Sequence, residues 1–414
     1  MDVGRATFVG AVAVLAVHVV DDSFVQPEPG TSAADHWVAG LATLGLLGLA
    51  VWGYGVVRPG ARAVIALLLG LFALVVSGEA WQAARSDAGA SGDDWTGLLV
   101  LPAGIVLIGL AAVLLWRSRR TDDRRLRRYV RRAGITVAAV LLLGYVVLPF
   151  LLTYGYTHVG TGEVAGDLGD HEHTEVTLTT SDGIDLNGTY VPSRNGAAVI
   201  AFPGRGPGHD AARFLADAGY GVLLYDRRGA SGNEGDPNAL GWGGVPDVEA
   251  GVAFLRDRPE VDPDRIGGIG FSVGGELLLE TAAGNEDLRA VVSEGAGIRS
   301  TREAVALPGM EKWLELPVWT STTLGTALFS GHLPPEGLQD LVPSIAPRPL
   351  LLIYAARGQG GERLTEEYFA AAGQPKQLWK TDSSHTAGYD SDPDGYARRV
   401  LAFFDDALLA GPSQ

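Results

Sequence analysis

The stretch Gly270-Phe271-Ser272-Val273-Gly274 decides the fold of the second half of this chain. An apolar run typical of a buried strand precedes it at residues 265–269, and a run typical of a helix follows it at residues 275–280. Glycines two residues to either side of a serine, between a strand and a helix, form the nucleophile-elbow pattern, in which a tight turn exposes the serine hydroxyl at the sheet edge. The alternative is an ordinary glycine-rich turn that contains a serine.

Alternating strand-like and helix-like runs surround this stretch. The first two strands are joined by residues 181–183, Ser-Asp-Gly, which favour a hairpin turn. A hairpin followed by repeated strand–helix units predicts an α/β domain with a mostly parallel sheet and helices on both faces. Strands are predicted at 175–180, 184–191, 197–202, 221–225, 266–271, 288–293, 350–354 and 377–380, and further helices at 211–218, 247–256 and 396–409.

Residues 298–349 interrupt this alternation and are rich in Leu and Pro, with Trp313 and Trp319 among them. An insertion at the carboxyl edge of the sheet would act as a lid or a wall of the substrate site. The alternative is an ordinary packing excursion.

Five apolar runs precede the α/β domain, and a helix needs about 20 residues to cross the hydrocarbon core of a bilayer. We therefore predict a membrane domain of four or five transmembrane helices over residues 1–156, a linker over 157–171 and an α/β domain over 172–412. The first run is short and could instead be a signal sequence, although no small-residue cleavage site follows it closely. The runs are 6–20, 37–57, 63–78, 96–116 and 133–154.

The distribution of arginine predicts the orientation of these helices. Residues 117–132 contain nine arginines between the last two runs, and such basic loops stay in the cytoplasm. The last helix then runs outward, so the α/β domain is expected on the extracytoplasmic face. The basic loop could also contact anionic membrane lipid. Polar residues inside the runs are few (His18, Glu79 and Gln82), which favours an anchor or packing scaffold over a transport pathway.

Charge is divided unevenly along the chain. Residues 1–154 hold 13 Lys and Arg against 11 Asp and Glu, whereas residues 155–414 hold 19 against 37. The acidic half argues against nucleic acid as a partner. Only three residues of the chain are lysine, and an acidic surface with Arg in place of Lys is typical of a salt-adapted protein. The chain has no cysteine, which excludes disulfides and thiolate chemistry.

Acyl transfer by a serine needs a base, an orienting acid and an oxyanion hole. Chain order on this fold is serine, acid, histidine. Two histidines follow Ser272, and His385 lies after the last predicted strand, where the base is expected, whereas His332 lies in the insertion. Glu362 is the carboxylate in the loop after the strand at 350–354, with Glu294 at the end of the preceding strand as the reserve.

The oxyanion hole should combine the backbone N–H of Val273 with an N–H from the glycine-rich loop at 203–208. We select the N–H of Arg205. A phosphate-binding loop is the alternative, but this loop lacks the Gly-Lys-Ser/Thr ending of a P-loop. The stretch His171-Glu172-His173 has the wrong spacing and no third ligand for a metal site.

Residues 172–410 resemble the α/β hydrolases of the dienelactone-hydrolase and acylaminoacyl-peptidase-like group. The resemblance rests on residues 262–266, Asp-Pro-Asp-Arg-Ile, that lead to the elbow, and on residues 225–232, Tyr-Asp-Arg-Arg-Gly-Ala-Ser-Gly. It implies a Ser272–His385–Glu362 triad that hydrolyses esters, amides or thioesters, and a structural role for Asp226. The loop after the third strand has Pro203-Gly204 where many members have His-Gly.

These observations predict a membrane-anchored serine hydrolase that acts on a small-molecule or lipid acyl substrate. No metal and no organic cofactor are implied. Two other hypotheses remain open. The fold could be a catalytically inactive binding or interaction domain on a membrane scaffold, or the same triad could transfer the acyl group to an acceptor other than water.

Overall fold

The computed structural model describes residues 3–85, 92–117, 125–160, 168–205, 212–358 and 361–410. The chain forms two compact units. A helical unit contains Met1–Val159 together with Pro317–His332, and an α/β unit contains Gly160–Leu316 together with Leu333–Gln414. Parts of several predicted segments lie outside the described residues: 86–91 between the third and fourth apolar runs, 118–124 of the basic loop, 161–167 of the linker, 206–208 of the glycine-rich loop with 209–211 after it, and 359–360 of the loop before Glu362.

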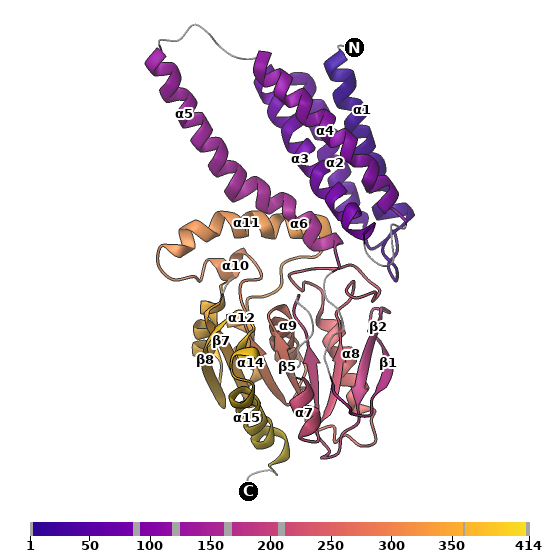
Figure 1. The fold of residues 1–414 in the computed structure, drawn as a ribbon, viewed down its shortest axis with the longest axis vertical. Helices are drawn as coiled ribbons and strands as arrows, with labels where there is room; N and C mark the ends of the chain where they lie inside the picture. Colours follow the sequence, from indigo (N-terminus) through magenta and orange to yellow (C-terminus); the bar gives the residue numbers. More distant parts are fainter. Residues whose placement is uncertain are drawn as a thin grey trace. The chain divides into compact units, whose positions relative to one another are not determined.

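Among the described residues, five helical segments are long and apolar enough to cross a membrane: Val3–Val25, Trp37–Val56, Pro59–Gln82, Asp94–Arg117 and Tyr129–His158. Most of each predicted apolar run falls within one of them. The helices of this unit (Figure 1) are α1 (Val3–Val20), η1 (Asp21–Val25), α2 (Trp37–Val56), α3 (Pro59–Ala83), α4 (Asp94–Arg117), α5 (Arg125–Leu142), η2 (Leu143–Val147) and α6 (Leu148–His158).

The predicted basic loop at 117–132 is shorter in the structure than in the sequence-based prediction. Helix α5 begins at Arg125, so the second half of the predicted loop is helical. Arginine and leucine are good helix formers, and this turn continues directly into the apolar part of the same helix.

Small and polar residues join the helices of this unit. A Cβ atom added at Gly104 of α4 would lie 2.8 Å from the Cβ of Ala73 of α3, so the two helices approach closely at this glycine. His18 of α1 forms hydrogen bonds of 3.1 Å with the hydroxyls of Thr96 in α4 and Tyr154 in α6. The buried His18 therefore links three helices.

Residues Pro317–His332 come from the insertion between two strands of the α/β unit, yet they group with the helices. Phe329 stacks on Phe72 of α3, with 5.8 Å between ring centroids, and packs on Phe150 of α6 at 5.5 Å. The sequence-based boundary placed the whole of 298–349 with the α/β domain, and the structure divides this segment between the two units.

The α/β unit is built on a mixed eight-stranded sheet in its described residues, with strand order β1-β2-β4-β3-β5-β6-β7-β8. Strands β1 and β2 form the predicted hairpin, β2 pairs antiparallel with β4, and the remaining pairs are parallel. All eight predicted strands are present: β1 (Thr174–Thr179), β2 (Asp185–Val191), β3 (Ala198–Phe202), β4 (Gly221–Tyr225), β5 (Ile266–Phe271), β6 (Ala290–Glu294), β7 (Leu350–Arg357) and β8 (Lys376–Ser384).

Helices cover both faces of this sheet because neighbouring residues of each central strand point to opposite sides. A Cβ added at Gly267 of β5 would meet Phe404 of α15, whereas one at Gly268 would meet Leu278 of α9. The remaining elements of this unit are α7 (Arg213–Asp217), α8 (Val245–Arg256), α9 (Val273–Gly284), α10 (Thr301–Ala304), α12 (Leu338–Leu341), η4 (Val342–Ile345), η5 (Glu362–Leu364), α13 (Thr365–Ala371), α14 (Gly388–Ser391), α15 (Pro393–Phe404) and η6 (Asp405–Leu409), and α11 (Glu311–Ser330) belongs in part to each unit.

Candidate active site

Ser272 occupies a strained turn between β5 and α9. Its backbone has φ 51° and ψ −125°, in the positive-φ region that residues other than glycine rarely adopt. Two hydrogen bonds hold this conformation. The Ser272 N–H donates to the carbonyl of Glu294 at 2.7 Å, and the Ser272 carbonyl accepts from the N–H of Glu276 at 3.0 Å. The neighbouring strand β6 and the first turn of α9 thus hold the nucleophile elbow in place.

The two flanking glycines are required by the close approach of backbone atoms. A Cβ at Gly274 would lie 2.4 Å from the carbonyl oxygen of Phe202 and 2.5 Å from that of Pro203. A Cβ at Gly270 would lie 2.6 Å from the carbonyl carbon of Gly274. Only glycine at both positions lets the start of α9 pack against the ends of β3 and β5 without displacing either strand.

The structure brings together the three residues predicted as the triad. His385 directly follows β8, and its Nε2 lies 3.0 Å from the Ser272 hydroxyl. Its Nδ1 forms a hydrogen bond with Oε1 of Glu362, the first residue of η5. Glu362 is only 2% exposed, and its second oxygen accepts the N–H of Ala355 at 2.9 Å.

This arrangement selects the protonation state that a general base needs. The Glu362 carboxylate is an acceptor, so the neutral imidazole of His385 carries its proton on Nδ1. Nε2 then has a free lone pair that faces the Ser272 hydroxyl, in position to take its proton.

Glu294, the reserve candidate for the acid, holds a different part of the site. One oxygen accepts the Gly388 N–H at 2.9 Å and the other accepts the Tyr396 hydroxyl at 2.6 Å. Burial raises the pKa of the Glu294 carboxyl, and these two hydrogen bonds act in the opposite direction. Glu294 thus fixes the segment that follows His385 to α15, while Glu362 forms the hydrogen bond with the imidazole.

Val273 and Gly204, the residue before Arg205, both lie next to Ser272. Val273 is the first residue of α9, where backbone N–H groups have no acceptor within the helix. A Cβ at Gly204 would lie 3.1 Å from the Cβ of Ser272, so the loop after β3 approaches the serine closely. Arg205 follows Gly204 directly and is exposed, and the rest of the glycine-rich loop lies outside the described residues.

Two glycines that the sequence analysis did not single out shape the site around the imidazole and its carboxylate partner. Gly295 has φ 77°, and a Cβ there would lie 3.1 Å from Cε1 of His385. A Cβ at Gly358 would lie 2.5 Å from both carboxylate oxygens of Glu362. The sequence could have indicated both glycines, because Gly295 directly follows strand β6 and Gly358 directly follows strand β7.

The other residues weighed from the sequence have local partners. His171 is 2.8 Å from a carboxylate oxygen of Asp217, and His173 forms a hydrogen bond with the carbonyl of His171. Asp226 accepts a hydrogen bond from the hydroxyl of Ser231 in the turn after β4. His332 belongs to the helical unit.

A mostly parallel sheet that presents Ser272 on an elbow defines the class of α/β hydrolases. The chain belongs to the X-Pro dipeptidyl-peptidase (S15) family, whose model matches residues 147–391. The uncharacterized protein YfhR of Escherichia coli K12 is 25% identical over 254 residues, which cover 56% of this chain and 81% of YfhR. The polyketide transferase grgF of a Penicillium species is 29% identical over 143 residues, 31% of this chain and 46% of that protein. The esterase Pf2001 of Pyrococcus furiosus has a similar solved structure, with 23% identity and a TM-score of 0.47 over 61% of this chain and 100% of that one.

The elbow geometry predicts different effects for two alanine substitutions in α9. Gly274→Ala should lower the free energy of unfolding by about 1–3 kcal/mol, because its Cβ overlaps the backbone at the end of β3. The control is Gly284→Ala at the other end of the same helix, where a Cβ would meet nothing within 4 Å, and it should be neutral or mildly stabilising. Denaturant unfolding of the full chain in detergent measures both. Equal stability of the two variants would contradict the close packing at Gly274.

The two carboxylates should differ in their effect on turnover. In Glu362→Gln, the amide oxygen must accept the Ala355 N–H, so the amide NH₂ faces Nδ1 and favours the tautomer with the proton on Nε2. That tautomer cannot accept the serine proton, and we expect kcat to fall by about 10⁴-fold. Glu294→Gln should cost less than about tenfold, since it weakens hydrogen bonds that only hold the loop. Turnover of a nitrophenyl ester by both variants checks this, and a larger loss in Glu294→Gln would reverse the assignment.

Proposed function

We propose that this protein is a membrane-anchored serine hydrolase that cleaves a carboxylic ester, amide or thioester through a covalent acyl-enzyme. One observation carries the proposal, namely the hydrogen-bonded series from the buried Glu362 carboxylate through His385 to the Ser272 hydroxyl on the elbow. A binding domain has no need of a strained serine, a histidine of defined tautomer and a buried carboxylate in one line, whereas nucleophilic catalysis needs all three.

The first half of the reaction forms the acyl-enzyme. The Ser272 oxygen attacks the carbonyl carbon of the substrate while Nε2 of His385 takes the hydroxyl proton. The carbonyl oxygen becomes an oxyanion, which the backbone N–H groups of Val273 and Arg205 stabilise. The intermediate collapses, the bond to the leaving group breaks, and the imidazolium returns its proton to the leaving alcohol, amine or thiol.

The second half releases the acid. A water molecule gives a proton to Nε2 of His385 as its oxygen attacks the acyl carbon, and the imidazolium then protonates Ser272 as the ester bond breaks. Glu362 holds the imidazole ring in place and stabilises its positive charge in both halves. Apart from the substrate and one water molecule, the steps use the side chains and backbone N–H groups named above.

The substrate class remains broad in this proposal. The family is named for a peptidase, so amide bonds are included, and attack by an activated serine cleaves esters and thioesters by the same steps. The acyl part is proposed to be small-molecule or lipid. The part of 298–349 that belongs to the α/β unit is proposed as a wall of the substrate site.

An activated serine should react with a fluorophosphonate probe. We expect the full-length protein in native membranes to be labelled, and Ser272→Ala to lose the label entirely, because the Ser272 hydroxyl lies 3.0 Å from Nε2 of His385, which is itself hydrogen-bonded to the buried Glu362. The label should be measured at high and low salt. A nucleophile other than Ser272 would leave the Ser272→Ala variant labelled, and a folded wild type without label would favour the inactive binding domain.

The proposed topology places the α/β unit outside the cell, and the absence of native cysteine permits a direct test. In Glu172→Cys, which alters an exposed residue of the α/β unit, the thiol should react with an impermeant maleimide in intact cells. In Arg58→Cys, between α2 and α3, the thiol should react only after lysis, because that turn is proposed to be cytoplasmic. The reverse pattern would keep the hydrolase and invert the orientation.

A further inference from the structure

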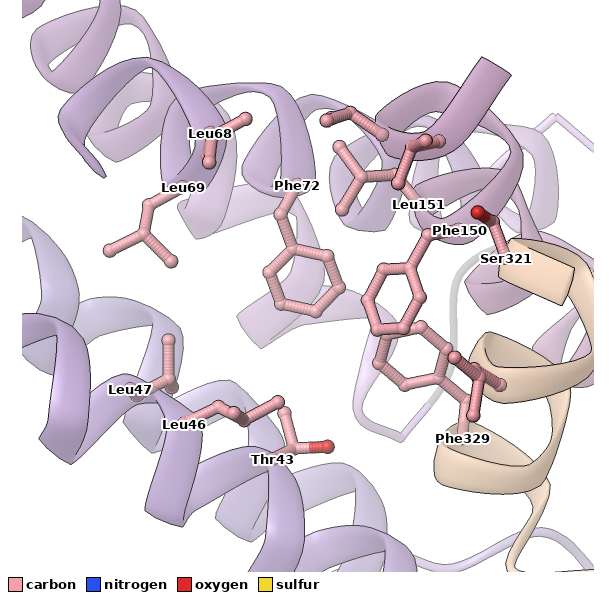
Figure 2. A pocket seen from close by; sticks show the side chains of 13 residues that line it. Thr43, Leu46, Leu47, Leu68, Leu69, Phe72, Phe150, Leu151, Ser321 and Phe329 are labelled. Carbon is pink, nitrogen blue, oxygen red and sulfur yellow. The ribbon is translucent and has the colours of Figure 1, made fainter. Parts of the chain in front are cut away.

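An apolar pocket lies among the helices of the helical unit, far in sequence from the triad. It has a volume of about 320 Å³, within the range of small-ligand pockets. Figure 2 shows its walls, which come from α2, α3, the region of η2 and α6, and the part of α11 that belongs to this unit. Eleven of its thirteen lining residues are Leu, Val or Phe, and the other two are Thr43 and Ser321.

The pocket has a buried floor and an open apolar rim. The side chains of Leu47, Phe72 and Leu151 are at most 8% exposed and form the floor. Leu46 of α2 and Leu324 of α11 are 48% and 61% exposed and lie at the rim. A ligand that enters this pocket therefore passes over leucine side chains, so the entrance favours apolar groups.

The lining offers almost nothing to a polar ligand. It contains no charged residue, and the Ser321 hydroxyl already donates to the carbonyl of Pro317 at 2.9 Å. A headgroup, a sugar or a peptide would lose its hydrogen bonds to water without replacement, at a cost of several kcal/mol. A hydrocarbon chain has no hydrogen bonds to water to lose. Three of the four walls also belong to helices of membrane-spanning length, so acyl chains would surround the pocket.

We propose that this pocket binds one acyl chain of a bilayer lipid. The proposal rests on the proposed membrane anchoring and is independent of the chemistry at Ser272. The bound chain would contact Phe72 and Leu151 at the floor, and also Phe329 of the insertion segment. Lipid would thereby stabilise the packing of residues Pro317–His332 within the helical unit.

The test is photo-crosslinking of the full-length protein in liposomes that contain a phosphatidylcholine with a diazirine in one acyl chain. Peptides that carry Phe72, Leu151 or Phe329 should be enriched in crosslinks relative to other lipid-facing parts of the helices. Leu46→Trp places a bulky side chain at the rim and should produce a severalfold loss of these crosslinks. The matched control is Leu49→Trp on the same helix, which is exposed outside the pocket and should leave them unchanged.

The outcomes separate the pocket from the anchoring on which it depends. Carbonate extraction of the same membranes reports anchoring, and a protein released by carbonate would overturn the membrane proposal first. A protein retained in the membrane with crosslinks spread evenly over its helices would overturn the pocket alone, as would equal losses in the two tryptophan variants. A diazirine fatty acid that labels the pocket when the phosphatidylcholine does not would overturn the bilayer lipid as the source.

Discussion

The turn at Ser272 is the constraint on which the α/β unit depends. Its positive φ costs about 1–3 kcal/mol in isolation, and surrounding structure must hold it. The bond from Ser272 N–H to the Glu294 carbonyl ties the turn to β6, and the glycine at 274 lets α9 approach the end of β3. The same contacts place the serine oxygen within 3.0 Å of His385. Packing and hydrogen bonding of β3, β5 and β6 around the turn thus offset the backbone strain at Ser272.

Two buried carboxylates, Glu362 and Glu294, hold different parts of the segment that carries His385. Glu362 forms the hydrogen bond with Nδ1 and selects the tautomer, whereas Glu294 accepts hydrogen bonds from Gly388 and Tyr396 and fixes the loop. Both are nearly fully buried, so each would be costly without its donors. We propose that these two roles explain why two buried carboxylates lie near His385: Glu362 orients its ring, and Glu294 fixes the backbone that follows it.

The inner part of the sheet was predictable because β3, β4, β5 and β6 are buried along their whole length and appear as short apolar runs between glycine or polar breaks. The elbow and the histidine position followed from chain order. The position of Glu362 after the strand at 350–354 favoured it over Glu294, but spacing alone did not exclude Glu294, because the choice depends on how the chain returns after β7 at Arg357. The division of α11 between the two units could not be predicted from the sequence. Because its first half contains Lys312 and Glu315, the helix does not appear as a long uncharged apolar run.

Helix α11 shows how an insertion of one unit can become part of another. Its first half exposes Trp313 and Leu314, whereas Phe329 in its second half is 7% exposed in a cluster with Phe72 and Tyr154. Part of the chain between β6 and β7 therefore buries its apolar side chains within the helical unit, away from the core of the α/β unit. Removal of the helices before the sheet would uncover this surface, and a hydrolase domain cut at the linker would carry an exposed apolar patch of the kind that promotes aggregation. The helices thus act as a packing partner of the insertion as well as a proposed anchor.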